Sequence, residues 1–467
     1  MRLRQVPTVL GAVLLPAALA HATPFLTPHL GGPVFVGPVD AHVTSLYWNP
    51  AAAGLLQGTH YYLSGTARLD WTQVERSTIS SDNGEPAGGG NVSFGTQTLT
   101  PLTVDNFVGV ISDLSSSEVT VGVALYSPYS ENLSSSDALA YHASGGLFYG
   151  ETVGIGLAYR VEPWLIIGVS GNLLFSKYHL QFTRDKALDG CVAAPCNVEA
   201  AASAEKYDLD APLIEFPTID ASFGFILRIS DWTFGFSTAN FLGAIAGTTA
   251  SLVGDARVTP AGSSSPLSGK TTIGFKLPVT VDLGAKRHVF GDWDLVLGAR
   301  WTHLATQNKL DLRVYGQALT AATIPDWIVR YRGLNDVYWA EVGLEEAPAT
   351  KYRWGVRARF STGGVPEEAV AIDQLDAPSV DLSGGLEWRL GERLGLTFAY
   401  TLSLLVPRDV TSSDFSPSAR IACNASQYDI TTAACAAVRD GRAIPTAAGK
   451  YLRIGNQLTL GVAIDLW

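Results

Sequence analysis

The chain has 467 residues and a formal net charge of -11, with 32 Lys and Arg against 43 Asp and Glu. A protein that binds nucleic acid neutralises phosphates with clustered Lys and Arg, so this balance excludes that class of partner. Hydrophobic residues make up 47% and charged residues only 16%, with 47 Gly, 17 Tyr and 11 Trp. This mixture is typical of short strands with aromatic girdles rather than of a soluble exported enzyme.

The first residues predict an export signal. Arg2 and Arg4 precede an apolar stretch at 9–20, and residues 20–22 have the small-x-small form that signal peptidase cleaves. We therefore expect residues 1–22 to be a signal peptide and the mature chain to begin at Thr23. The rest of the sequence has no apolar run near the roughly 18 to 20 residues that a helix needs to cross a bilayer, so the chain is not a helical membrane protein.

Residues 23–59 form a segment without strand alternation, and it contains Gly-Pro and Asn-Pro steps. Irregular backbone of this kind cannot face lipid, because its polar groups would be left without hydrogen-bond partners. We expect the segment to lie in the periplasm or inside the lumen of a barrel.

From residue 60 to the end, apolar residues alternate with small or polar ones at period two. One face of each strand would then suit lipid and the other face water, which is the pattern of a transmembrane barrel. The predicted strands lie near 60–75, 105–114, 119–126, 152–161, 164–182, 217–230, 232–249, 270–287, 292–314, 336–347, 351–361, 379–390, 394–405 and 450–467.

The connections between these strands alternate between short and long. A barrel with both termini in the periplasm needs tight turns on that side and longer loops outside, whereas a soluble sandwich has no reason to sort its loops in this way. We therefore predict an all-β protein, a fourteen-stranded antiparallel transmembrane β-barrel over residues 60–467, in the bacterial outer membrane.

Four cysteines occur as two close pairs, Cys191 with Cys196 and Cys423 with Cys435, and both pairs fall in long connections. In an oxidising compartment, local disulfides are the simplest interpretation. Zinc would require two further ligands near each pair, and no His lies near either pair. We predict two disulfides, no metal and no cofactor.

The stretch from 40 to 59, centred on Asn49-Pro50-Ala51, resembles the N-terminal hatch of the FadL family, including its TodX-like branch. Weaker similarities follow in the order of the family at 121–129, 157–161, 277–278, 335–336 and 342–344. FadL-type proteins are outer-membrane channels for long-chain fatty acids or aromatic hydrocarbons. The resemblance implies a fourteen-stranded barrel that residues 23–59 plug from inside, with Asn49, Pro50 and Ala51 as the hatch step.

The resemblance also implies that ligand is captured at the outer loops, binds in the lumen and leaves sideways through a kinked third strand. On this chain the third strand is 118–128, and Gly122 and Pro128 are the candidate positions for the lateral opening. The alternative for Gly122 is an ordinary small residue that faces the lumen. Ser130 stands where the family often has Gly, so the kink can differ here.

The expected function is passive transport of hydrophobic small molecules, with long-chain fatty acids as the first choice. Burying about ten methylenes at roughly 0.8 kcal/mol each outweighs the cost of ordering the ligand chain. Aromatic hydrocarbons are not separated from fatty acids by the sequence, because both require only apolar volume.

The strand from Lys351 places four cations on its polar face: Lys351, Arg353, Arg357 and Arg359. Flanking strands offer Glu341, Glu345, Asp381 and Glu387. The first interpretation is ion pairing across strands that fixes the register and fills the lumen. The second is that Arg353 or Arg357 binds the carboxylate of a substrate.

Three other functions remain open: a general diffusion pore, a structural or adhesive barrel, and an outer-membrane esterase or phospholipase. No Ser/His/Asp spacing, zinc motif or phosphate loop is present, so we expect no enzyme activity. His29 and His42 either titrate as parts of a gate or are simply hydrogen-bonded in the plug. We expect a monomer whose partners are a hydrophobic ligand and outer-membrane lipid.

Overall fold

The computed structural model describes residues 29–87, 92–133, 137–142, 145–213, 217–246, 249–347, 351–371, 375–411 and 446–466, together with 423, 425, 426, 432 and 435. The predicted signal peptide lies outside the described residues.

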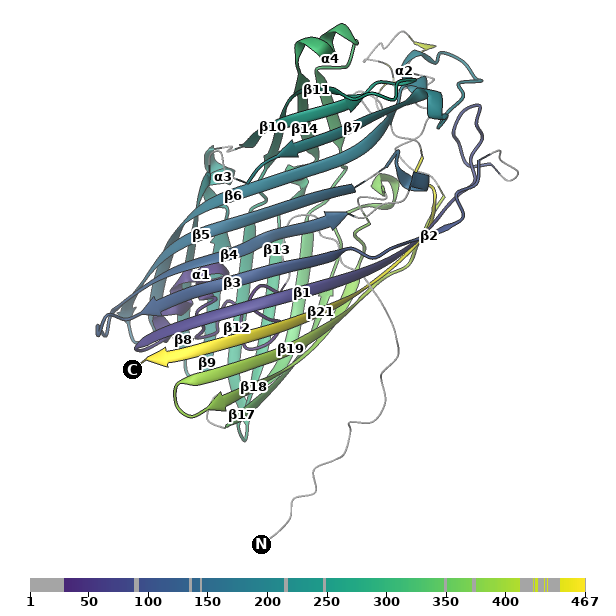
Figure 1. The fold of residues 1–467 in the computed structure, drawn as a ribbon. Helices are drawn as coiled ribbons and strands as arrows, with labels where there is room; N and C mark the ends of the chain where they lie inside the picture. The colour runs from purple at the N-terminus through teal and green to yellow at the C-terminus, as the bar shows by residue number, and fades with distance from the viewer. Residues whose placement is uncertain are drawn as a thin grey trace.

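Fourteen long strands close into one antiparallel barrel (Figure 1). In order around the wall they are β1 (Thr59–Arg76), β3 (Leu102–Ser112), β4 (Val119–Leu133), β5 (Gly145–Glu162), β6 (Leu165–Asp185), β8 (Thr218–Ile229), β9 (Trp232–Ala239), β12 (Thr280–Phe290), β13 (Trp293–Thr302), β16 (Val337–Glu346), β17 (Tyr352–Ser361), β18 (Ser379–Leu390), β19 (Leu394–Leu405) and β21 (Gly449–Leu466). The last strand pairs with the first from Thr59↔Leu466 to Arg76↔Gly449, which closes the ring. The predicted fold class and strand number are confirmed.

The alternation of side chains explains why these segments are strands of a membrane barrel. Along β1, every second residue from Tyr62 to Arg76 is buried in the lumen, and the residues between them point outward. The outward face is apolar: Leu63 is 52% exposed, Leu460 55% and Ile155 61%. Side chains of this kind at such exposure require a hydrocarbon surrounding.

Three predicted strands are wrong in their extent. The segment predicted at 232–249 ends as a strand at Ala239 and continues as helix α3 (Phe241–Ala246). The segment at 270–287 is two strands, β11 (Leu267–Lys276) and β12, because Pro278 between them has no N–H for a ladder. The segment at 292–314 divides likewise into β13 and β14 (Lys309–Tyr315).

The long connections form strands of their own. β7 (Ala204–Ala211), β10 (Thr249–Thr259), β11, β14 and β15 (Trp327–Tyr331) continue the sheet from β6 beyond the wall, in the order β6–β7–β10–β11–β14–β15 (Figure 1). Two further short strands, β2 (Thr96–Leu99) and β20 (Arg408–Val410), pair with residues 72–75 of β1 and 449–451 of β21. Buried aromatic and aliphatic side chains, including Phe148, Tyr178 and Phe275, pack together inside this end of the barrel.

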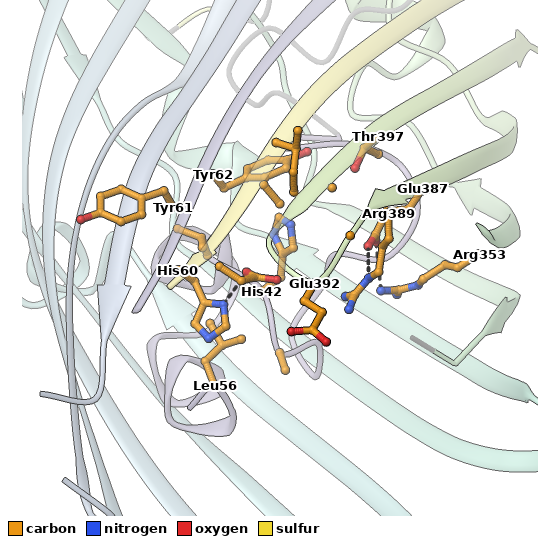
Figure 2. Close-up of a pocket in the computed structure, with 17 residues that line it drawn as sticks. His42, Leu56, His60, Tyr61, Tyr62, Arg353, Glu387, Arg389, Glu392 and Thr397 are labelled. Atoms are coloured by element: carbon orange, nitrogen blue, oxygen red, sulfur yellow. Dashed lines mark hydrogen bonds and ion pairs between the residues drawn. The ribbon is translucent and has the colours of Figure 1, made fainter. Parts of the chain in front are cut away.

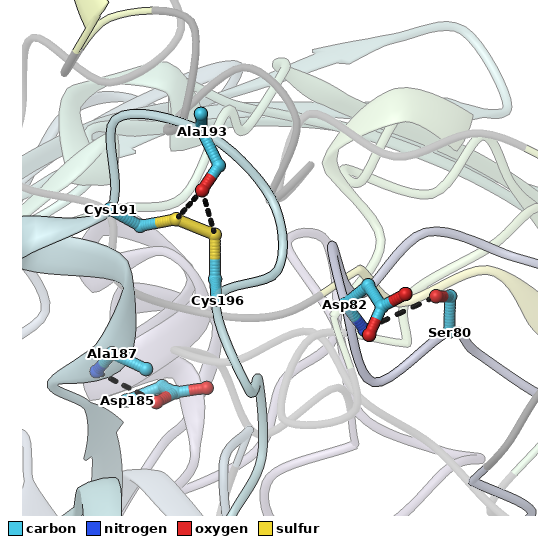
Figure 3. The surroundings of a disulfide bond; sticks show 7 residues. All are labelled: Ser80, Asp82, Asp185, Ala187, Cys191, Ala193 and Cys196. Carbon is cyan, nitrogen blue, oxygen red and sulfur yellow. Dashed lines mark hydrogen bonds between the residues drawn. A yellow bond between two sulfur atoms is a disulfide. The ribbon is translucent and has the colours of Figure 1, made fainter.

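Both predicted disulfides, Cys191–Cys196 and Cys423–Cys435, are present. The first one closes a loop that lies against the connection after β1 (Figure 3). The backbone N–H of Cys196 donates to the carbonyl of Asp82 at 2.7 Å, and that of Val198 donates to Ser81 at 2.8 Å. Two of the long loops are therefore tied to each other.

The described part of the N-terminal segment, residues 29–58, contacts the inner wall of the barrel. It contains the short helices α1 (Ser45–Trp48) and η1 (Pro50–Leu55), which Figure 1 shows enclosed by the strands. Glycines on the wall make room for it: a Cβ on Gly168 would lie 2.3 Å from the backbone nitrogen of Ala51. A Cβ on Gly235 would lie 2.3 Å from the carbonyl oxygen of Pro38. No helix in the described part of the chain is long and apolar enough to span a membrane.

Candidate functional site: a lumenal pocket beside a break in the wall

Strand β4 is only partly paired with its neighbour β3. The ladder between them runs from Ser112↔Val121 to Phe107↔Tyr126 and then ends. Beyond this point β3 remains paired with β1, and β4 remains paired with β5. Within the described residues, the backbone ladder between these two adjacent wall strands is thus interrupted, and side-chain hydrogen bonds such as that from Asn132 to the carbonyl of Leu102, at 3.0 Å, join them instead. We refer to this interrupted stretch as the separation of β3 and β4.

The separation begins at a bulge in β4. Tyr126 pairs with Thr152 and Tyr129 pairs with Gly150, so Ser127 and Pro128 together oppose the single residue Glu151. An extra residue bends a strand, and proline contributes no N–H to a ladder. The break therefore follows from the local sequence.

The two predicted positions for the lateral opening behave differently. Pro128 lies in the bulge. Gly122 lies in the fully paired part of β4, opposite Ile111 on β3 and Gly156 on β5. A Cβ on Gly122 would lie 3.0 Å from Leu46 of the N-terminal segment, so this glycine faces the lumen and makes room for the segment. Gly122 corresponds to the alternative interpretation and is not part of the break.

A pocket lies in the lumen beside the bulge. Tyr47 of α1 contributes one side, and Pro128 and Tyr129 of β4 lie on another. The remaining lining residues come from the wall and its connections: Tyr126, Thr152, Asn172, Leu174, Asp220, Ser222, Ala239, Asn240, Leu277, Thr280 and Arg300. The cavity between these side chains is small, about 30 Å³, so a ligand the size of toluene would have to displace some of them.

The charged groups of this pocket are already engaged. Arg300 donates to both carboxylate oxygens of Asp282, at 2.6 and 2.9 Å, and its guanidinium lies 4.7 Å from the ring centre of Trp48. Asp220 accepts the backbone N–H groups of Ala221 and Leu242, at 2.6 and 3.0 Å. The pocket therefore offers aromatic surface and neutral polar groups. These residues come from separate strands, so the pocket could not be predicted from the sequence beyond the tyrosines of 121–129.

The three residues predicted as the hatch step, Asn49, Pro50 and Ala51, form the start of helix η1. The side chain of Asn49 accepts from the N–H of Ala51 at 3.1 Å and donates to the carbonyl of Pro38 at 2.8 Å. Pro50 occupies the first turn of η1, where its missing N–H costs nothing. Ala51 is fully buried against Gly168. Asn, Pro and Ala suit these three positions because the segment starts a helical turn here while it is in contact with the wall.

The lumenal cations of β17 are bound to protein carboxylates. Arg357 donates to Glu345, Glu341, Asp40 and the carbonyl of Val36, at distances between 2.7 and 3.2 Å. These contacts use all five of its N–H groups. The ion-pairing interpretation therefore fits Arg357, and binding of a substrate carboxylate does not.

The other cations of β17 are distributed along the same wall. Arg359 pairs with Glu341 at 2.8 Å, and Arg353 pairs with Glu387 at 3.2 Å. Lys351 is exposed and lies over the ring of Tyr352, so it does not point into the lumen as predicted.

A second, more polar pocket lies where the N-terminal segment meets β1, β18, β19 and β21 (Figure 2). His42 and Arg353 line it, together with His60, which bonds Asp465 at 2.7 Å. Burial lowers the pKa of His42 to about 4. Burial, aided by the positive charge of Arg359, also lowers the pKa of His29 to about 4. Both imidazoles are neutral at pH 7.

A closed barrel with an apolar outer face, short turns at one end and long loops at the other is a transmembrane β-barrel of the outer-membrane type. No family model matches the sequence, and no curated protein matches it. Solved structures are similar in fold. A Pseudomonas aeruginosa FadL homologue aligns with a TM-score of 0.70 and 12% identity, over 94% of this chain and 99% of its own.

Two toluene transporters align as well. TodX of P. putida has a TM-score of 0.61 and 11% identity, over 91% of this chain and 94% of its own. TbuX of Ralstonia pickettii has a TM-score of 0.56 and 13% identity, over 94% and 97%. The chain therefore has the barrel fold of the FadL homologue and these transporters, and the predicted resemblance is confirmed at the level of the fold.

Proposed function

We propose that the chain is an outer-membrane channel for hydrophobic small molecules, a transporter and not an enzyme. Ligand is captured at the long loops, binds in the lumenal pocket and leaves sideways into the bilayer between β3 and β4. The observation that carries this proposal is the position of the bulge: Pro128 lines the pocket, and the pairing of β3 with β4 ends two residues before it.

In this proposal the N-terminal segment acts as a plug. Its residues fill the lumen below the pocket, and Tyr47 forms part of the pocket itself. A ligand in this pocket meets packed protein toward the short turns, whereas the separation of β3 from β4 leads toward hydrocarbon. Release into an apolar phase is also what a hydrophobic compound favours, by about 0.8 kcal/mol for each methylene.

Two ligand classes enter the proposal. Long-chain fatty acids are the class predicted from the sequence. Aromatic compounds are suggested by the similarity of the fold to toluene transporters and by the tyrosines around the pocket. Uptake of labelled oleate and of labelled toluene by cells that lack their own channels measures both classes.

Deletion of Pro128 tests the proposal. Without this residue, Ser127 would pair with Glu151 and Tyr129 with Gly150, which restores a continuous ladder between β4 and β5. We expect uptake to fall by at least about tenfold while the barrel still forms. Pro128→Ala is the matched control: it keeps the extra residue, and it should retain most of the uptake. Normal uptake by the deletion variant would refute lateral release.

A general diffusion pore is the alternative function. Swelling of liposomes in sugars separates the two, because a lumen filled by residues 29–58 should admit almost no sugar. Rapid swelling with the intact chain would favour the pore.

A further inference from the structure

The wall carries polar side chains on its membrane-facing side, next to the bulge. Asn106 of β3 lies on the same face as Val104 and Val108, which are 59% and 45% exposed. Glu151 of β5 lies on the same face as Ile155, which is 61% exposed. A carboxylate on the lipid-facing side of a barrel strand is costly, so its presence there indicates a function.

Four residues form this group, which we name the exit cluster: Asn106, Ser127, Tyr149 and Glu151. Their hydrogen bonds converge on one oxygen. Glu151 Oε2 accepts from the hydroxyl of Ser127 at 3.0 Å, from Asn106 Nδ2 at 3.4 Å and from the hydroxyl of Tyr149. The hydroxyl oxygens of Ser127 and Tyr149 lie 2.8 Å apart.

Two acceptors of the exit cluster have no hydrogen-bond partner among the described residues. They are Glu151 Oε1 and Asn106 Oδ1, and both are buried. The orientation of the Asn106 amide follows from its neighbour, because a carboxylate accepts and the Nδ2 group must face it. Buried acceptors without a partner are rare in folded proteins. The exit cluster therefore lacks a donor.

The bulge connects the exit cluster to the lumenal pocket. Ser127 belongs to the cluster, and the next residue, Pro128, lines the pocket. A molecule that moves from the pocket through the separation of β3 and β4 passes both Glu151 and Asn106 before it reaches lipid.

We infer that the exit cluster binds a hydroxyl group, and that the transported compounds are neutral hydrophobic molecules that carry one, such as alkylphenols or long-chain alcohols. This inference rests on the proposed function and specifies its ligand. A hydroxyl donates one hydrogen bond to the acceptors and remains neutral on entering hydrocarbon.

Two other head groups fit less well. A fatty carboxylate accepts without donating and is repelled by Glu151. The lumen offers it no compensating cation at Arg300 or Arg357, because protein carboxylates hold both. An ammonium group would enter hydrocarbon as a charge, which is strongly unfavourable.

The test compares p-cresol with toluene, which differ only by the hydroxyl group. Dissociation constants are measured by ligand-observed NMR on the full mature chain in nanodiscs, for the wild type and for Glu151→Gln. In that variant an amide NH₂ replaces Oε1, so a donor stands where an acceptor was. We expect binding of p-cresol to weaken by about tenfold and binding of toluene to stay unchanged. Binding of p-tolualdehyde, which only accepts, should become tighter.

Asp255→Asn is the matched control, since Asp255 is an exposed carboxylate of β10 that pairs with Lys270 far from the bulge. It should change none of the three constants. Equal weakening of p-cresol and toluene in Glu151→Gln, or no change in either, would overturn the inference, as would wild-type protein that binds p-cresol no better than toluene. Failure of the proposed function looks different: the wild type would then take up none of oleate, toluene and p-cresol into cells.

Discussion

Two strands of the same wall, β17 and β4, differ in how completely their backbones are paired. β17 is paired from Tyr352 to Ser361 with β18, and from Gly355 to Ser361 with β16. Its central cation, Arg357, has every N–H group bonded. β4 loses its pairing with β3 after Tyr126, and two buried acceptors beside its bulge have no partner in the part of the chain that the structure describes.

We relate this difference to two roles of the wall: β17 anchors the N-terminal segment, and the break beside β4 is the proposed place of ligand release. Where the wall must hold the N-terminal segment, the buried charges compensate one another across sequence distances of more than 300 residues, as in the pair of Asp40 with Arg357. Along the proposed ligand path, backbone pairing is interrupted, and Glu151 and Asn106 each keep an acceptor without a partner among the described residues. Buried polar groups stabilise the fold in the first region, and we propose that they bind ligand in the second.

The largest effect is expected from Arg357→Ala. It leaves Asp40, Glu341 and Glu345 buried close together without this cation, and removing one partner of a buried ion pair costs about 3–5 kcal/mol. We expect the free energy of unfolding to fall by that amount and the N-terminal segment to become sensitive to protease. Lys270→Ala, which removes an exposed pair with Asp255, is the control and should have little effect. Equal stability of the two variants would contradict the anchoring role.

A smaller effect is expected from Gly168→Ala. Its new Cβ would lie 2.3 Å from the backbone of Ala51, so either the segment or β6 must shift, at about 1–3 kcal/mol. Gly171→Ala, on the same strand, is the matched control, because a Cβ there meets no atom within 4 Å. Unfolding in urea compares the two variants. The packing of the segment against the wall would be in doubt if Gly171→Ala were the more destabilised.

The smallest effect is expected on how the free energy of unfolding changes with pH. His29 lies between Asp381, Arg359 and Glu341, and its folded pKa of about 4 is below the ordinary value of 6.5. The unfolded chain therefore binds the proton first, so the free energy of unfolding falls as pH decreases from 6.5 to 4, by up to about 1.4 kcal/mol per pH unit. His29→Gln should reduce this slope, as measured by unfolding at several pH values. An unchanged slope would mean that His29 is already charged in the fold.

The sequence predicted the anchored wall better than the break. Period-two alternation and loop lengths gave the fourteen strands, because lipid outside and water inside impose them on every strand. The alternation extended too far at Ala239 and Pro278, since apolar residues continue there after the ladder ends. Strands such as β10 were missed because they lie beyond the membrane, where the loops pack on each other.

The site was predicted in part. Pro128 was named because the resemblance placed a lateral opening in the third strand and proline disturbs a ladder; the structure places it in the bulge, and its role stays a prediction. Glu151 was missed, because only the register of β4 with β5 brings it to Ser127. That every N–H group of Arg357 is bonded could not be predicted either. One of its partners is Asp40, whose position in the lumen depends on how the whole N-terminal segment folds.

The account depends most on passage between β3 and β4, and a reversible lock across that gap tests it most directly. Asp105 of β3 and Ser130 of β4 are hydrogen-bonded across the upper end of the separation, so cysteines introduced by Asp105→Cys and Ser130→Cys lie close enough to be joined. Uptake of labelled p-cresol is measured before and after oxidation and again after reduction, with each single variant as the control. The account predicts that uptake is lost on oxidation and restored on reduction in the double variant alone. Uptake that continues unchanged with the cross-link formed would contradict it.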